Sequence, residues 1–440
     1  MRVEAAALPL PEIGAPPVPS VPRPERFTLR NGLRVLSVHR DDLPQVAIRM
    51  VVPAGSVMDP GNAPGVASMV GALLTEGTDE LSANVLNERI DMLGAALSAR
   101  VGHDHAEIDL GLLSETLDEG LALLAAVVAR SAFPERELER VRAETLDALD
   151  ARLDEPANVA DDESSRALFG AEHPYGRLPI GTAEGVSRLR REDLVAFHQA
   201  HYRPEGSVLV IGGDLSGGDL RSRLEGAFAG WTGSAVTPSY PAEPSKLAAG
   251  STLLNIVREE AAQAEIRVAG LGMPRNSDDW VVAAVANYIL GGSTITGRLG
   301  SNLREDKGWT YGVRSGFAAA VQAGGWIVET AVDADVAADA LTEIRNEIAR
   351  IASELVSQEE LDRAKEALIL SLPRAFETPA RVVSRLATLE AYGLEPEYWD
   401  RFPARVQRVT REDVMRIARR YFSAGQLVQV AVGPKLGGGS

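Results

Sequence analysis

An internal repeat constrains the fold of this chain more than any other feature of its sequence. The matching segments are 39–49 with 257–267, 186–194 with 406–414, and 208–213 with 428–433. The first pair is offset by 218 positions and the other two by 220. Separate matches at nearly one offset indicate a duplicated unit of about 200 residues, so the chain should contain two copies of one fold.

Both halves have the same expected order of elements. In the first half, extended segments at 27–30, 33–38 and 46–53 precede an apolar-periodic helix, and a strand at 97–110 follows it. Longer helices come next, and a last helix leads into a closing strand. There is no glycine fingerprint of a βαβ unit. The pattern therefore predicts an α+β protein of two homologous α/β domains, each a mostly antiparallel sheet covered by helices.

Composition suggests where the two domains begin and end. We expect a Pro- and Ala-rich flexible arm at 1–25, a first domain at 26–229 and a second at 251–434. Between them, 230–250 is rich in Gly, Pro, Ser and Ala and is predicted to be a linker. Residues 435–440 are predicted to be a tail.

The charge balance and the missing cysteines exclude several classes of function. The chain has 45 Lys and Arg against 62 Asp and Glu, a net charge of −17, and no basic patch stands out, so nucleic acid is not an expected partner. With no cysteine there is no disulfide, thiolate catalysis or Cys-ligated zinc. Apolar runs are shorter than the roughly 20 residues of a membrane span. The first 25 residues are a poor signal peptide, which leaves cytoplasm and periplasm open.

Several motifs together resemble one family of enzymes. They are the segment 65–78 that follows 52–56, His-Pro-Tyr-Gly at 173–176, Tyr-Arg-Pro at 202–204, and Gly-Arg-Leu at 297–299 running on to 303–305. These motifs resemble the insulinase/pitrilysin/processing-peptidase family of zinc metallopeptidases, over about residues 25–434. The resemblance implies that the two domains form one half of a clamshell, in which four such domains close around a peptide.

The zinc chemistry of that family is missing from this chain. Its active members carry His-x-x-Glu-His on the first helix, where two histidines ligate zinc and the glutamate activates water, and a further glutamate ligand lies downstream. The positions that match this motif hold Ser68, Gly71 and Ala72, and Ala148 stands 76 residues after Ala72 in the expected helix 137–149. We therefore expect no metal in this chain.

The small side chains on the first helix allow two interpretations. Ser68, Gly71, Ala72 and Thr75 form a stripe opposite the apolar one. This stripe either permits close packing of the helix or leaves a peptide-sized hollow without metal.

The second half keeps a pair of residues that the resemblance makes functional. Arg304 and Tyr311 are seven positions apart, and active family members have an Arg and a Tyr at this spacing, facing the zinc. By resemblance, Tyr311 would donate its hydroxyl to the oxyanion of the scissile carbonyl, and Arg304 would hold a substrate carbonyl. Without the resemblance, a surface charge and a core ring would explain the two residues. Lys307 and Gly308 are expected to end the helix.

Two histidine pairs are weaker candidates for a metal site. His103 and His105 would share one face of the strand 97–110, and His198 and His201 are three positions apart on a helix. Neither pair has an obvious carboxylate to complete a ligand set, so packed or surface histidines are the favoured interpretation.

The segment 292–299 resembles a P-loop in the spacing of its glycines only. Arg298 and Leu299 stand where a P-loop has Lys and Ser or Thr, so the phosphate and magnesium contacts are missing. The glycines are expected instead to let the backbone pass close to its neighbours.

Three hypotheses follow for the function. The first is a non-catalytic subunit of a heterodimeric zinc peptidase, without a cofactor of its own, whose homologous partner brings His-x-x-Glu-His and zinc while this chain presents Arg304 and Tyr311 to peptide substrates. The alternative is a structural or peptide-binding core subunit of the same fold, without a peptidase role. The third is an unrelated activity that uses His103 and His105.

Overall fold

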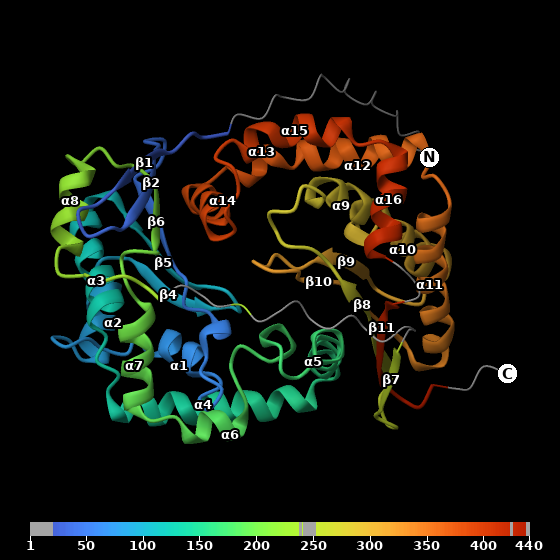
Figure 1. The fold of residues 1–440 in the computed structure, drawn as a ribbon, viewed down its shortest axis with the longest axis horizontal. Helices are drawn as coiled ribbons and strands as arrows, with labels where there is room; N and C mark the ends of the chain where they lie inside the picture. Colours follow the sequence, from blue (N-terminus) through green and yellow to red (C-terminus); the bar gives the residue numbers. More distant parts are fainter. Residues whose placement is uncertain (1–20, 237–239, 241–251, 423–425, 437–440) are drawn as a thin grey trace, which may run out of the picture.

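The computed structural model describes residues 21–236, 240, 252–422 and 426–436. Within these residues the two halves of the sequence form two α+β domains side by side, each a mixed sheet with helices (Figure 1). Most of the expected arm (1–25) and linker (230–250), and the end of the expected tail (435–440), lie outside the described residues. No helix in the described part of the chain is long and apolar enough to cross a membrane.

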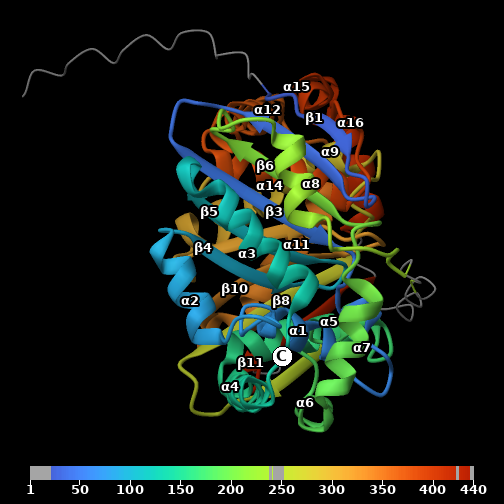
Figure 2. The same cartoon turned by 90° about the vertical axis from the view of Figure 1, so that its left-hand side faces the viewer.

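The first half forms a sheet in the order β1-β2-β6-β3-β5-β4. Its strands are β1 (Glu25–Thr28), β2 (Arg34–His39), β3 (Gln45–Val52), β4 (Ala96–Val101), β5 (Ala106–Leu113) and β6 (Val208–Gly213). Its helices are α1 (Val66–Leu73), α2 (Ala83–Met92), α3 (Leu117–Arg130), α4 (Glu135–Asp154), α5 (Pro156–Phe169), α6 (Ala183–Arg188), α7 (Arg191–His201) and α8 (Leu220–Phe228). Helices α3 and α8 cover the outer face of this sheet (Figure 2).

The second half forms a sheet in the order β7-β11-β8-β10-β9. Its strands are β7 (Thr252–Val257), β8 (Gln263–Leu271), β9 (Val313–Phe317), β10 (Gly325–Asp333) and β11 (Val428–Gly433). Its helices are α9 (Trp280–Asn287), α10 (Arg298–Gly300), α11 (Ala337–Ser353), α12 (Gln358–Leu370), α13 (Leu372–Ala375), α14 (Pro379–Ala391), α15 (Tyr398–Arg408) and α16 (Arg411–Tyr421).

The strand registers confirm the repeat. Ala47 faces Gly212 across β3 and β6, and Glu265 faces Val432 across β8 and β11, which reproduces the offsets of 218 and 220. In both sheets the closing strand is antiparallel to one neighbour and parallel to the other, β2 or β7. The sheets are therefore mixed, because the closing strand returns to the sheet after a long helical connection that allows parallel pairing.

The repeated Arg-Glu-Asp sequence has a capping role in both halves. Asp193 accepts a hydrogen bond from the Arg190 backbone N–H at the start of α7 (2.8 Å), and Asp413 accepts one from the Thr410 N–H at the start of α16 (3.1 Å). A carboxylate at the third helical position that reaches back in this way fixes where a helix begins. The most visible part of the repeat therefore specifies the two helix starts.

Each half lends a helix to the sheet of the other. Helix α5 packs on β8 and β11 of the second sheet, and α14 packs on β3 and β6 of the first (Figure 1). Strand β6 is buried on both faces because Val208 and Val210 point toward the core that contains α14, whereas Leu209 and Ile211 point toward α3 and α8. This exchange joins the two halves through their cores.

The structure corrects the expected strand 97–110. It is two strands, β4 and β5, joined by a turn that the Gly102 N–H closes by donating to the His105 carbonyl (2.9 Å). Gly and Asp are turn formers, and Gly102 and Asp104 interrupt the apolar alternation here. His103 and His105 therefore lie in a turn, and the prediction that they share a strand face is wrong.

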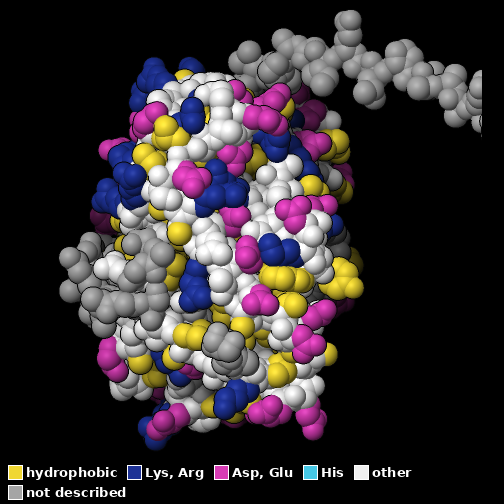
Figure 3. Space-filling view, turned by 90° about the vertical axis from the view of Figure 1, so that its right-hand side faces the viewer, with side chains coloured by type: hydrophobic (Ala, Val, Ile, Leu, Met, Phe, Trp, Pro, Cys, Tyr) yellow, Lys and Arg dark blue, Asp and Glu magenta, His cyan; other side chains and the backbone are white. Residues whose placement is uncertain are grey.

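On the face of the second half beside α11, the described surface has no cluster of charges of one sign. Basic and acidic side chains are interspersed over the described part of this face (Figure 3). It presents no continuous basic surface of the kind that binding to phosphate backbones requires.

Candidate functional site

Helix α1, which carries the positions of the zinc motif, begins at a buried cap. The Asp59 carboxylate accepts hydrogen bonds from the backbone N–H groups of Gly65 (2.6 Å) and Ala67 (2.9 Å). Gly65 has φ of +92°, a left-handed conformation that glycine adopts without strain. Burial raises the pKa of Asp59 to about 6, against the lowering effect of these hydrogen bonds.

The four motif positions do not fit a zinc ion. Ser68 donates its hydroxyl to the Pro179 carbonyl (2.7 Å), and a Cβ at Gly71 would lie 2.4 Å from Cγ2 of Val101 on β4. Ala72 and Ala148 are exposed and carry no ligand atom. Among the described residues there is no group of three or more His, Cys, Asp or Glu side chains that could hold a metal ion. Close packing thus accounts for Gly71 but not for Ala72 or Ala148.

Helices α1 and α4 correspond to the helices that frame the zinc site in the family that the chain resembles, and they still lie together. Thr145 of α4 contacts Met69 of α1 through its hydroxyl (3.5 Å to the sulfur), so α1 and α4 are adjacent. The carboxylates nearby are held by Arg140, whose pKa they raise through hydrogen bonds. The distances from Arg140 are 2.7 Å to Glu76, 2.8 Å to Glu137 and 2.9 Å to Glu144. These carboxylates are paired with Arg140 and do not form a ligand set.

Arg304 lies on a π-helical turn, Ser301–Asp306, that follows α10. Its side chain is 38% exposed, and its ion-pair partner is the adjacent Glu305 at 3.6 Å. The turn ends as the sequence predicts, because Gly308 adopts φ of +66° and donates its N–H to the Arg304 carbonyl (3.2 Å). Single π-helical turns are frequent at functional sites, and here the turn leaves the guanidinium accessible.

Tyr311 lies in the short segment between that turn and β9. Its side chain is 94% exposed, so it is not the core ring that sequence reasoning alone would favour. The backbone around it is fixed, because the Thr310 hydroxyl binds both the N–H (3.0 Å) and the carbonyl (2.9 Å) of Gly312. Among the described residues, Arg304 and Tyr311 form no hydrogen bond with each other. The structure places both side chains at the surface of one connection, with Tyr311 projecting from a pinned backbone.

The histidines have structural contacts. The His103 ring packs on Tyr175 (5.2 Å between ring centroids) and the His105 ring packs on Tyr392 (5.8 Å). His198 is buried and lies 2.9 Å from the Val128 carbonyl through Nε2, and burial lowers its pKa to about 4. Burial also lowers the pKa of His103, His105 and His201, so these rings are neutral at pH 7.

The glycine-rich segment 292–299 is tightly packed backbone, as expected. A Cβ at Gly297 would lie 2.6 Å from the Ser293 carbonyl oxygen. Arg298 binds Glu360 at the start of α12 (2.6 Å), and although burial opposes ionisation, this hydrogen bond lowers the pKa of Glu360 to about 2. Arg298 thus anchors a helix.

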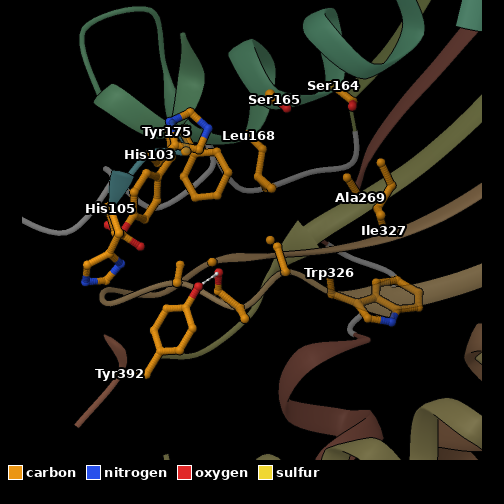
Figure 4. Close-up of a pocket in the computed structure, with 18 of the residues that line it drawn as sticks. His103, His105, Ser164, Ser165, Leu168, Tyr175, Ala269, Trp326, Ile327 and Tyr392 are labelled. Carbon is orange, nitrogen blue, oxygen red and sulfur yellow. Dashed lines mark hydrogen bonds between the residues drawn. The ribbon is translucent and has the colours of Figure 1, made fainter. Parts of the chain in front are cut away.

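Sequence reasoning missed a cavity of about 480 Å³ at the junction of the two halves (Figure 4). Its wall includes the β4–β5 turn with Asp104, the end of α5, strand β10, and Tyr392 after α14. Tyr175, part of the His-Pro-Tyr-Gly motif, donates its hydroxyl to Asp104 (2.7 Å). The sequence signal was Asp104 between two histidines, a pattern that sequence reasoning weighed only as a weak metal candidate.

Comparisons with known proteins agree with this architecture. Residues 34–177 match the family model described as insulinase (peptidase family M16), and residues 188–368 match the model described as peptidase M16 inactive domain. A protein of Mycobacterium tuberculosis named an uncharacterized zinc protease is 26% identical over 401 residues, which cover 91% of each chain. A crystal structure of a peptidase M16 inactive domain from Pseudomonas fluorescens is 29% identical, with a TM-score of 0.87 over 94% of this chain and 98% of that one. A protease from Helicobacter pylori, 19% identical with a TM-score of 0.87 over 94% of this chain and 100% of that one, shares the fold.

Proposed function

Because the chain belongs to the insulinase family of peptidases and consists of two domains of that family, we propose that it is the non-catalytic subunit of a heterodimeric zinc peptidase. A homologous partner supplies His-x-x-Glu-His and zinc, and this chain closes the chamber around a peptide. The observation that carries the proposal is Tyr311, an aromatic side chain that is 94% exposed on a pinned backbone, in a chain whose own zinc positions hold no ligands.

The roles of the two residues follow from their chemistry. The Tyr311 hydroxyl has no hydrogen-bond partner among the described residues, so it can donate to the oxyanion that forms on the scissile carbonyl. Arg304 presents several N–H donors in a rigid planar fork, so it suits a substrate carbonyl that must be held in register. A donor aimed at developing charge contributes about 3–4 kcal/mol to lowering the barrier.

The test removes one hydroxyl from the assembled complex. The chain is purified with its partner from its source organism, the partner is identified by mass spectrometry, and cleavage of a fluorogenic peptide is measured with and without a chelator. Tyr311→Phe should lower turnover by about 10²–10³-fold while the complex still assembles. Tyr288→Phe, which deletes the hydroxyl of a tyrosine packed against the core of the second half, is the matched control and should leave turnover unchanged. Equal turnover in Tyr311→Phe and wild type would refute the assigned role.

A structural or peptide-binding subunit without a peptidase role is the second candidate. It is favoured by the absence, in the described part of the chain, of any hydrogen bond that directs Arg304 and Tyr311 toward a common point. This candidate predicts that a peptide titration gives the same affinity for wild type and Arg304→Ala, and that no chelator-sensitive cleavage accompanies the purified chain.

A further inference from the structure

The cavity at the junction of the halves has one polar end and one apolar end. His103, His105, Tyr175 and Tyr392 lie at the polar end, and the apolar end is lined by other residues (Figure 4). Those are Leu168, Ala269 and Ile327, beside Ser164 and Ser165 of α5. A volume of about 480 Å³ falls in the range of small-molecule sites, which combine apolar walls with a few placed polar groups.

Asp104 is the polar group at the centre of the polar end. It is only 5% exposed, yet it lines the cavity. One carboxylate oxygen accepts the Tyr175 hydroxyl (2.7 Å) and the other accepts the Val321 N–H (2.9 Å). The Tyr240 hydroxyl is a further hydrogen-bond partner. A carboxylate oxygen has two lone pairs, so Asp104 keeps capacity for another donor.

No cation balances this carboxylate within the part of the chain that the structure describes. Arg100, on the same wall, pairs instead with Asp109 (2.9 Å) and Glu107 (3.6 Å), and these acids also bind Arg49. That group of two arginines and two acids is neutral by itself. His103 and His105 are neutral at pH 7 because burial lowers their pKa. Among the described residues that line the cavity, Asp104 therefore has no ion-pair partner, and an unpaired charge is costly to bury.

Aromatic rings surround the charge. Tyr175 packs edge-on against Phe169 (5.6 Å between centroids), and Tyr392 is fixed by donating its hydroxyl to the Ala319 carbonyl (3.2 Å). Ring faces attract cations, and a carboxylate beside them adds a direct ion pair. The combination favours a positively charged head group over a neutral or anionic one.

We propose that this cavity is a binding site for a small amphipathic amine, whose ammonium group binds Asp104 among the tyrosines and whose apolar body lies against Leu168, Ala269 and Ile327. The site is built from other elements than Arg304 and Tyr311, and it does not depend on the proposed peptidase role. A purely structural role for Asp104, in which its bond to Val321 joins the β4–β5 turn to the β9–β10 turn, would explain the hydrogen bonds. It would not explain the charge that faces the cavity.

The test uses three probes of one shape and different charge. Hexylamine, 1-hexanol and hexanoate are titrated into the full chain at pH 7.5 by isothermal calorimetry. Hexylamine should bind saturably at one site, and the other two should bind at least tenfold more weakly. Asp104→Asn should weaken hexylamine by tenfold or more, whereas Asp150→Asn, an equal loss of charge at an exposed position of α4, should have no effect.

A second variant tests the cavity without touching the charge. Ala318 is exposed and lines the cavity, so Ala318→Trp should preserve the fold and occlude the space. It should abolish hexylamine binding, and it decides the question if Asp104→Asn does not fold. Absence of hexylamine binding at millimolar concentration, equal binding of hexanoate, or unchanged affinity in Ala318→Trp would overturn the proposal.

Discussion

The contact between α1 and β4 leads to a prediction about the stability of a Gly71 variant. Whether Gly71→Ala raises or lowers the free energy of unfolding depends on one methyl group of Val101. Gly71 lies inside α1, where alanine is normally favoured over glycine by about 1 kcal/mol. A Cβ at this position would lie 2.4 Å from Cγ2 of Val101, a separation that real carbon atoms do not tolerate. Overpacking of this kind costs about 1–3 kcal/mol. We therefore expect Gly71→Ala to lower the free energy of unfolding by up to about 2 kcal/mol.

Removing the methyl groups of Val101 should reverse the sign. In a Val101→Ala background, Gly71→Ala should raise the free energy of unfolding by up to about 1 kcal/mol, because only the helix propensity remains. The assay is a double-mutant cycle of urea unfolding curves followed by circular dichroism, with slopes checked for constancy. A coupling energy near zero, or a stabilising Gly71→Ala in the wild-type background, would refute the packing argument. It would also reopen the interpretation that a hollow rather than a contact lies beside α1.

Three further predictions concern stability. Because His198 has a pKa of about 4 in the folded chain and about 6.5 when unfolded, its contribution to the free energy of unfolding should fall by up to about 3 kcal/mol from pH 6.5 to pH 4. His198→Gln should remove that part of the pH profile of the urea midpoint, and an unchanged profile would contradict it. Separately expressed fragments 26–229 and 251–434 should each be poorly folded by circular dichroism and should regain structure on mixing, since α5 and α14 each pack on the sheet of the other half. Two stable separate fragments would show that this exchange is dispensable. Arg298→Ala should lower the free energy of unfolding by about 2 kcal/mol, because it leaves Glu360 without its ion-pair partner. Adding Glu360→Gln to this variant should recover part of the loss in thermal unfolding. An unchanged melting temperature in Arg298→Ala would count against this prediction.

Local patterns were read correctly where local chemistry decides the structure. The closing strands 208–213 and 428–433 coincide with β6 and β11, and the repeat segments 186–194 and 406–414 contain the starts of α7 and α16, which Asp193 and Asp413 cap. These features depend on side-chain periodicity and on hydrogen bonds between residues three apart, which the sequence contains in full. The prediction of one strand at 97–110 was wrong, because a two-stranded hairpin keeps the apolar alternation on both sides of its turn.

By itself the sequence determined the duplicated α+β fold, the family resemblance and the absence of ligand side chains at Ser68, Gly71, Ala72 and Ala148. Only the tertiary structure decided what surrounds those positions and how the two halves meet. The exchange of α5 and α14, the exposure of Tyr311 and the charge of Asp104 facing a cavity each depend on segments far apart in the chain. Such contacts arise from the packing of whole elements, which leaves no periodic signal in any one segment.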